Sequence, residues 1–149
     1  MTDKPKATLV PELACRDAAA SMAFYTKILG FRVLYDRPEY GFYYLERHGA
    51  EIMIEQLSDT SWLTGALELP FGRGLHFQIM TTDLAALYDT CIAHGVTIFR
   101  ECEDAWYRAD DHYVGQRQFI VCDLDGYMLR FAENLGAQSE LPQTGRVVG

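Results

Sequence analysis

Residues 115–134 read GQRQFIVCDLDGYMLRFAEN, two apolar stretches on either side of an Asp-Gly pair. The pair, at 125–126, favours a tight hairpin turn, because glycine tolerates the positive φ that such turns require. Apolar side chains alternate from Tyr127 to Phe131, and Arg130 lies on the opposite face of the same predicted strand. The stretch therefore predicts a hairpin with one face packed on a core and one face that presents an arginine to a groove.

The same succession of elements is expected twice along the chain. A strand leads into a helix, at 18–29 and again at 83–94, and each helix ends at a glycine, Gly30 or Gly95. The expected strands are 7–14, 31–35, 40–46, 50–57, 75–81, 96–100, 119–122 and 127–132. Residues 101–113 are charged and aromatic without a clean period, so we predict an irregular loop there. The repeat predicts an α+β fold of two paired βαβββ modules that form a curved mixed sheet.

Length and composition suit one domain. The chain has 149 residues, of which 49% are hydrophobic and 23% are charged. We expect a single domain over 1–149, with a module at 7–57, a linker at 58–73, a module at 74–135 and a loosely ordered tail at 136–149.

Charge and cysteine usage restrict the possible partners. The formal net charge of −8 disfavours nucleic acid and favours either solubility or cationic ligands. No run is long enough for a membrane span, and residues 1–6 lead into no signal peptide, so we expect a cytoplasmic protein without a membrane partner. The cysteines form no Cys-x-x-Cys pair and are expected to stay reduced; they are Cys15, Cys91, Cys102 and Cys122.

Two motifs of the repeat resemble a known family. Residues 24–31 read FYTKILGF, which is similar to the helix-end signature of the vicinal-oxygen-chelate superfamily, also called the glyoxalase/bleomycin-resistance/dioxygenase fold. Residues 123–127 read DLDGY, which resembles the final hairpin of that family, with Leu124 in place of the usual proline. The resemblance covers residues 7–135 and implies two modules around a ligand groove.

The resemblance also implies where a metal would be held. Enzymes of the family bind one divalent metal with four side chains, and the matching positions here are Pro11, Glu55, His76 and Arg130. Proline has no ligand atom and arginine stays cationic, so we expect neither a metal nor another cofactor. A shift of one residue in the first strand would instead bring Glu12 to the first position. Glu12, Glu55 and His76 would then suffice for an open catalytic site.

Loss of the metal with an arginine at the last position is the pattern of the bleomycin-resistance branch. VPEL at 10–13, TDLAALY at 82–88 and MLRF at 128–131 resemble that branch. Its members do no chemistry; they exchange first strands to form a dimer and bind a cationic glycopeptide drug between the two chains. The resemblance implies a strand-swapped homodimer that sequesters an aromatic or cationic small molecule. The chain departs from this branch at Val114, a position where members of the branch often have a tryptophan.

The candidate ligand-binding residues are charged or aromatic. They are Glu55, His76, Arg130, Trp62, Trp106, Tyr107 and Arg117. Glu55, His76 and Arg130 are expected to form a charge triad across the groove in preference to a metal site. Trp62 and Trp106 fall in predicted loops, where each could stack on a planar ligand or simply pack.

Three functions remain open at this point. The first is a non-catalytic binding protein, and the second is a metal-dependent lyase, isomerase or dioxygenase that uses Glu55 and His76. The third is a structural or interaction module without a deep groove. Metal content distinguishes the first two.

Overall fold

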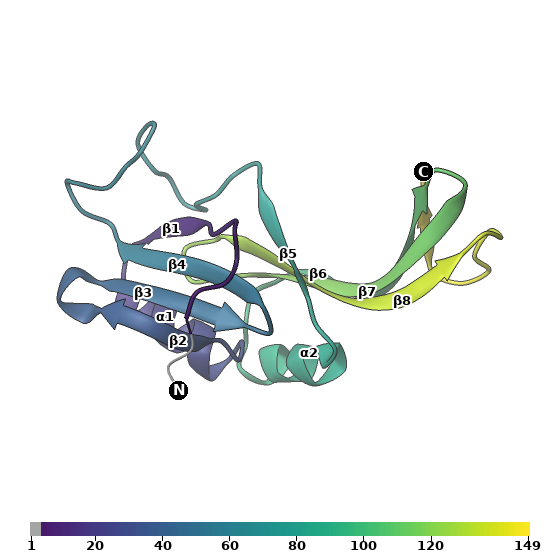
Figure 1. Ribbon diagram of the computed structural model, residues 1–149, viewed down its shortest axis with the longest axis horizontal. Helices are drawn as coiled ribbons and strands as arrows, with labels where there is room; N and C mark the ends of the chain where they lie inside the picture. Colours follow the sequence, from purple (N-terminus) through teal and green to yellow (C-terminus); the bar gives the residue numbers. More distant parts are fainter. Residues whose placement is uncertain (1–3) are drawn as a thin grey trace. The chain divides into compact units, whose positions relative to one another are not determined.

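The computed structural model describes residues 4–149, which fold into two α-helices and nine strands. They form two compact units, drawn in sequence colours in Figure 1. The first unit runs to Arg73 and includes Asp123–Tyr127, and the second comprises Gly74–Cys122 and Met128–Gly149. Each unit begins with a strand and a helix and continues with at least three strands, which confirms the predicted α+β fold.

The first unit is a four-stranded sheet with one helix on it. Its elements are β1 (Glu12–Cys15), α1 (Ala18–Lys27), β2 (Arg32–Arg37), the 3₁₀ helix η1 (Pro38–Tyr40), β3 (Phe42–Arg47) and β4 (Ala50–Gln56). The strand order is β1-β4-β3-β2, with β1 parallel to β4 and the other neighbours antiparallel. Alternate side chains of the strands face α1 and form the core of the unit.

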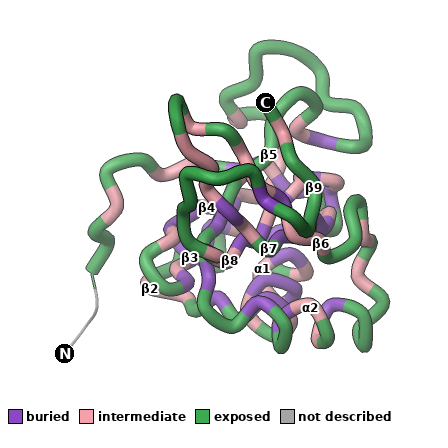
Figure 2. The backbone as a smooth tube through the Cα atoms, turned by 90° about the vertical axis from the view of Figure 1, so that its right-hand side faces the viewer, coloured by how far each residue is buried: buried purple, intermediate pink, exposed green. Residues whose placement is uncertain are grey.

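The helix α1 has the ends that its sequence predicts. The Asp17 carboxylate accepts a hydrogen bond from the Ala20 amide at 3.0 Å, as an N-cap does. Gly30 follows the helix with a φ of 77°, a conformation that glycine adopts without strain. The helix buries Phe24 and Tyr25, whose rings meet edge to face at 5.6 Å. This packing accounts for the buried segments around α1 in Figure 2.

The second unit is a five-stranded sheet, also with one helix. Its elements are β5 (His76–Met80), α2 (Leu84–Ala93), β6 (Ile98–Ala109), β7 (His112–Cys122), β8 (Met128–Gln138) and β9 (Arg146–Val148). The strand order is β5-β8-β7-β6-β9, and the two outer strands run parallel to their neighbours. Phe119 and Phe131 stack at 5.6 Å in its core, and Tyr88 of α2 packs on Phe119.

The predicted irregular loop at 101–113 is wrong, because these residues belong to two long paired strands. β6 and β7 are joined by a two-residue turn in which Asp110 has a φ of 55°. Across the pair, the Arg117 guanidinium binds the Asp104 carboxylate at 2.8 Å. Cross-strand ion pairs of this kind support a strand whose sequence lacks apolar alternation.

The tail at 136–149, predicted to be loosely ordered, is also paired. β8 continues to Gln138, and β9 adds to the edge of β6. The Arg146 guanidinium binds the Glu103 carboxylate at 2.8 Å, and this and other hydrogen bonds lower the pKa of Glu103 to about 2. A tertiary ion pair therefore orders a segment that has little local preference for a strand.

Candidate functional site

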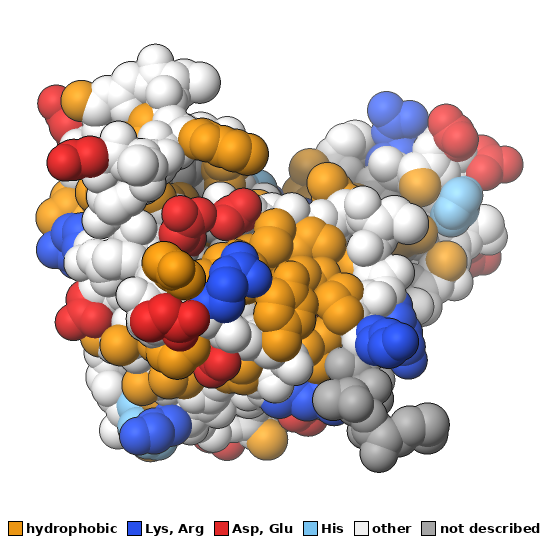
Figure 3. Space-filling model, turned by 60° about the vertical axis from the view of Figure 1, so that its left-hand side comes forward, with side chains coloured by type: hydrophobic (Ala, Val, Ile, Leu, Met, Phe, Trp, Pro, Cys, Tyr) orange, Lys and Arg blue, Asp and Glu red, His pale blue; other side chains and the backbone are white. Residues whose placement is uncertain are grey.

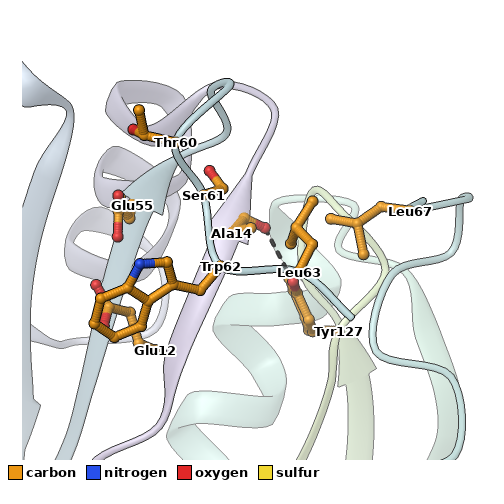
Figure 4. Close-up of a pocket in the computed structure, with 9 residues that line it drawn as sticks. All are labelled: Glu12, Ala14, Glu55, Thr60, Ser61, Trp62, Leu63, Leu67 and Tyr127. Atoms are coloured by element: carbon orange, nitrogen blue, oxygen red, sulfur yellow. Dashed lines mark hydrogen bonds between the residues drawn. The ribbon is translucent and has the colours of Figure 1, made fainter. Parts of the chain in front are cut away.

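One cavity in the first unit gathers acidic, aromatic and aliphatic side chains, and we call it the Trp62 cavity. Its volume is about 380 Å³, which suits a small organic molecule. It is lined by Glu12, Ala14, Glu55, Thr60, Ser61, Trp62, Leu63, Leu67 and Tyr127. Figure 4 shows Glu12 and Glu55 on neighbouring strands, with the indole of Trp62 beside them.

The register of β1 and β4 brings the two carboxylates together. Ala14 pairs with Glu55 and Glu12 pairs with Met53, so these side chains share one face of the sheet. Pro11 precedes β1, and its carbonyl accepts a hydrogen bond from the Met53 amide at 2.8 Å. Glu12 and Ala14 are thus the β1 residues that share a face with Glu55, and of these Glu12 carries the carboxylate that the alternative register of the first strand would bring there.

The neighbouring Glu55 perturbs the carboxyl group of Glu12. Burial raises the pKa of Glu12 above its ordinary value of 4.5, and a hydrogen bond and charge repulsion from Glu55 raise it further. The Arg37 guanidinium lowers the pKa of Glu12 in part. Glu12 thus retains its proton to a higher pH than a lone glutamate, and the cavity becomes more negative as that proton leaves.

The same face of the sheet carries aromatic rings beside the carboxylates. Tyr35 stacks on Tyr44 with ring centroids 5.0 Å apart, and the Arg37 guanidinium lies 3.9 Å above the ring of Phe42. Phe42 lies directly across β3 and β4 from Glu55. Figure 3 shows acidic side chains next to a broad hydrophobic area on one face of the molecule. Planar and cationic groups both find partners on such a surface.

Tyr127 closes one side of the cavity and is fixed at both ends. Its hydroxyl donates to the Ala14 carbonyl at 3.0 Å, and its amide donates to the Asp123 carboxylate at 3.0 Å. A Cβ atom at Gly72 would lie 2.5 Å from the tyrosine ring, so that glycine permits the close approach. Burial raises the pKa of Tyr127 to about 12, and the phenol stays neutral near neutral pH.

The hairpin turn that carries Tyr127 is anchored to the first unit by buried polar contacts. The Tyr25 hydroxyl donates to the Asp123 carboxylate at 2.6 Å, and the Arg16 guanidinium binds Asp125 at 2.9 Å. Burial raises the pKa of Asp123, although the hydrogen bond from Tyr25 lowers it in part. The turn predicted from Asp-Gly thus contributes to the cavity wall.

Trp62 follows a compact turn and presents its ring to solvent. The Ser58 amide donates to the Ser61 hydroxyl at 2.9 Å, and the Ser61 amide donates to the Ser58 carbonyl at 3.2 Å. The Trp62 side chain is 95% exposed. An indole held at the mouth of a cavity without covering apolar contacts is available to a ligand.

Trp106 differs from Trp62, because its ring packs on the protein. It lies in β6 opposite Gly115, where an added Cβ would come within 2.6 Å of the indole. Its neighbour Tyr107 accepts a hydrogen bond from the buried Gln118 amide at 2.6 Å. Both residues were placed in a loop by the sequence and lie in a strand.

The other predicted site residues also lie in the second unit. His76 is exposed at the start of β5, and Arg130 in β8 donates a hydrogen bond to Gln78. Arg117 is held by Asp104. Glu55 and Trp62 belong to the first unit, and the predicted grouping of Glu55 with His76 and Arg130 stays a prediction.

Neither a strong metal site nor an activated thiol is apparent in residues 4–149. No group of three His, Cys, Asp or Glu side chains there has the geometry to hold a metal, and the Trp62 cavity supplies two carboxylates. Burial raises the pKa of the Cys15 thiol to about 12, which suppresses the thiolate. The more exposed Cys102 also has a raised pKa, mainly because of burial. These donor sets do not fit a family metal centre in the first unit.

Several cavity residues were missed by the sequence reading. Tyr127 was assigned to an apolar strand face, and Thr60, Ser61, Leu63 and Leu67 lie in a segment without periodicity. Only the Trp of this segment carried a signal, since an aromatic in a predicted loop is unusual enough to single out.

Comparison with known proteins identifies the family. The profile of the Glyoxalase/Bleomycin resistance protein/Dioxygenase superfamily matches residues 8–131. The chain belongs to this superfamily. A superfamily member from Vibrio splendidus 12B01 is 33% identical over 83% of this chain and 95% of its own, with a TM-score of 0.39. A search of curated proteins finds no match to the chain.

Solved structures of lower identity share the superfamily fold. TioX from Micromonospora sp. ML1 is 23% identical, with a TM-score of 0.63, over 87% of this chain and 100% of its own. A superfamily member from Alicyclobacillus acidocaldarius is 19% identical, with a TM-score of 0.61, over 89% of this chain and 94% of its own. In residues 4–149 of the chain studied here, no helix is long and apolar enough to cross a membrane.

Proposed function

We propose that this superfamily member is a non-catalytic binding protein, similar in action to bleomycin-resistance proteins, that sequesters an aromatic or cationic small molecule. The observation that carries the proposal is the Trp62 cavity, in which Glu12 and Glu55 lie beside an exposed indole. Carboxylates attract and orient a cation, and an indole face binds both cations and planar rings. Leu63 and Leu67 add apolar surface for the uncharged part of the ligand.

The chemistry of the cavity favours binding over reaction. A nucleophile needs a lowered pKa or an adjacent base, whereas burial raises the pKa of Tyr127 to about 12. The Tyr127 hydroxyl is already engaged with a backbone carbonyl. The raised pKa of Glu12 would allow it to exchange a proton, but the other hydroxyls that line the cavity, those of Thr60 and Ser61, are hydrogen-bonded to Ser58.

We also propose that the protein acts as a strand-swapped homodimer in the cytoplasm, with its ligand groove at the dimer interface. Tyr35, which is 42% exposed and stacks on the buried Tyr44, supports an interface on this face of the first unit. Light scattering after size-exclusion chromatography tests the dimer. A monomer at micromolar concentrations and above would contradict it.

Binding is tested by calorimetry with bleomycin and with simple aryl cations such as phenylguanidine. We expect Glu55→Gln and Trp62→Ala each to weaken binding about tenfold, because each removes a principal contact. The matched controls are Glu101→Gln, which changes the same charge on the second unit, and Phe99→Ala, which truncates a ring that is 61% exposed there. Equal losses in the controls, or no binding of any compound, would refute the proposal.

A metal-dependent lyase, isomerase or dioxygenase is the second candidate. One observation favours it, because Glu12 shares a face with Glu55, as a ligand from the first strand would. It requires a further ligand beyond the two carboxylates of the Trp62 cavity. Metal content separates this candidate from the binding protein.

A further inference from the structure

The hydroxyl groups that line the Trp62 cavity are already bonded within the protein. The Tyr127 hydroxyl donates to a backbone carbonyl at 3.0 Å. The hydroxyls of Thr60 and Ser61 are bonded to Ser58 at 3.0 and 2.9 Å. The two carboxylates are therefore the charged acceptors that the cavity leaves to a ligand, and a ligand must bring the donors that bind them.

The carboxyl groups of Glu12 and Glu55 lie close enough for one small group to contact both. β1 runs parallel to β4, and Ala14 of β1 pairs with Glu55, so the two acidic side chains are neighbours on one face. A side-chain hydrogen bond joins them when Glu12 is protonated. Amidinium and guanidinium groups carry parallel N–H donors, which fit carboxylate oxygens that lie side by side.

The charges around the cavity balance when one cation is added. Glu12 and Glu55 are acidic, and the Arg37 guanidinium acts on Glu12 from its place over the ring of Phe42, 3.9 Å from the ring centroid. Among the described residues, no Lys or Arg lines the cavity itself. With both carboxylates ionised, the three charged side chains leave one negative charge, which a monocation neutralises.

The cavity offers one open aromatic ring and no cage of rings. Trp62 is 95% exposed, whereas Tyr127 is 7% exposed and meets Phe71 edge to face at 6.1 Å. Quaternary ammonium ions are typically bound in cages of several aromatic rings. A single indole face suits a flat group that stacks on it, and Figure 4 shows the indole beside both carboxylates. The cavity therefore favours a flat cation whose edge carries N–H donors.

We propose that the Trp62 cavity selects a flat cation with two N–H donors, an amidinium or a guanidinium, that bridges Glu12 and Glu55 and stacks on Trp62. This inference rests on the proposed function and names the class of its cation. A quaternary ammonium has the same charge but no donor. It would remove water from the carboxylates without returning a hydrogen bond, and it would bind more weakly.

Calorimetry with three probes of similar size tests the inference. Benzamidine carries an amidinium on a phenyl ring, and phenyltrimethylammonium has the same ring and charge without an N–H group. Benzamide keeps the flat shape and an NH₂ group without the charge. We expect benzamidine to bind at least about tenfold more tightly than either of the other two.

A variant of one carboxylate separates hydrogen bonding from charge. Glu12→Gln should weaken benzamidine about tenfold and phenyltrimethylammonium only about twofold, because the second probe loses a distant charge and no hydrogen bond. Glu101→Gln, which changes an exposed glutamate of the second unit, should alter neither affinity. Equal affinity of the two cations for the wild type, or equal losses of both in Glu12→Gln, would overturn the selection of N–H donors.

Failure of this selection and failure of the proposed function give different results. If both cations bind equally and both lose affinity in Trp62→Ala and Glu55→Gln, the Trp62 cavity is a cation site that does not select donors. If none of the three probes binds, both the selection and the proposed cation site are wrong.

Discussion

Tyr25→Phe removes one hydroxyl from a fully packed position and tests the anchoring of the hairpin turn. The Tyr25 hydroxyl donates to the Asp123 carboxylate at 2.6 Å, and Tyr25 has no measurable exposure. A hydrogen bond to a charged group is worth about 1.5–3 kcal/mol, and the phenyl ring refills the same space. Asp123 keeps hydrogen bonds from the Asp125 and Tyr127 amides at 2.9 and 3.0 Å.

We therefore expect Tyr25→Phe to lower the free energy of unfolding by about 2 kcal/mol. For a chain of this size, that loss lowers the melting temperature by about 4–8 °C. Urea titration of the wild type and the variant measures it. Tyr35→Phe removes a hydroxyl from an exposed ring and should change the free energy of unfolding by less than about 0.5 kcal/mol. A loss of that small size in Tyr25→Phe would refute the anchoring role.

The pH dependence of this variant has a defined sign. The hydrogen bond from Tyr25 lowers the pKa of Asp123, while burial raises it above the ordinary value of 3.8. Without the hydroxyl the pKa rises further, so the variant loses stability as the pH rises through the pKa of Asp123 in the folded protein. At lower pH the carboxyl is protonated in both proteins and the deficit shrinks. A deficit that is larger in acid would contradict this reasoning.

Three further predictions concern other positions in the two units. Trp106→Ala should lower the free energy of unfolding by about 1–3 kcal/mol, because it empties a packed position. Trp62→Ala should change that free energy by less than about 0.5 kcal/mol. Urea titration measures both, and equal losses would contradict the difference in packing. Gly126→Ala should lower the melting temperature, since its Cβ would lie 2.4 Å from the Cβ of Pro70 where φ is 95°; an unchanged melt would show that the turn adjusts freely. The affinity for phenylguanidine should rise as the pH passes upward through the raised pKa of Glu12, above the ordinary value of 4.5, because the cavity gains negative charge. A flat calorimetric profile would show that the charge of Glu12 does not contribute to binding.

The repeated modules were predictable because local chemistry specifies them. Asp17 caps α1, and Gly126 has the positive φ that its hairpin turn requires, so turn and cap residues carried the right signal. The strand expected at 96–100 is the start of β6, but its continuation to Ala109 was missed because its support comes from the partner strand, where Arg117 binds Asp104. A single sequence does not reveal which charged residues will meet across a strand pair.

The candidate site was only partly predictable for a similar reason. Glu55 and Trp62 were identified from residue type and from their strand or loop context. Glu12 was named only in the alternative that shifts the first strand by one residue, because the sequence does not show that β1 begins after Pro11 and that Glu12 pairs with Met53.

The central claim is that the carboxylates of the Trp62 cavity serve an organic cation and not a catalytic metal. Metal analysis of the chain purified without chelator tests this most directly, with thermal melts in added zinc, manganese, iron or nickel as the companion readout. We predict well below one metal ion per chain and no shift of the melt, because two carboxylates make a weak site. One tightly held metal ion per chain, lost in Glu55→Gln, would contradict the account and favour the enzyme.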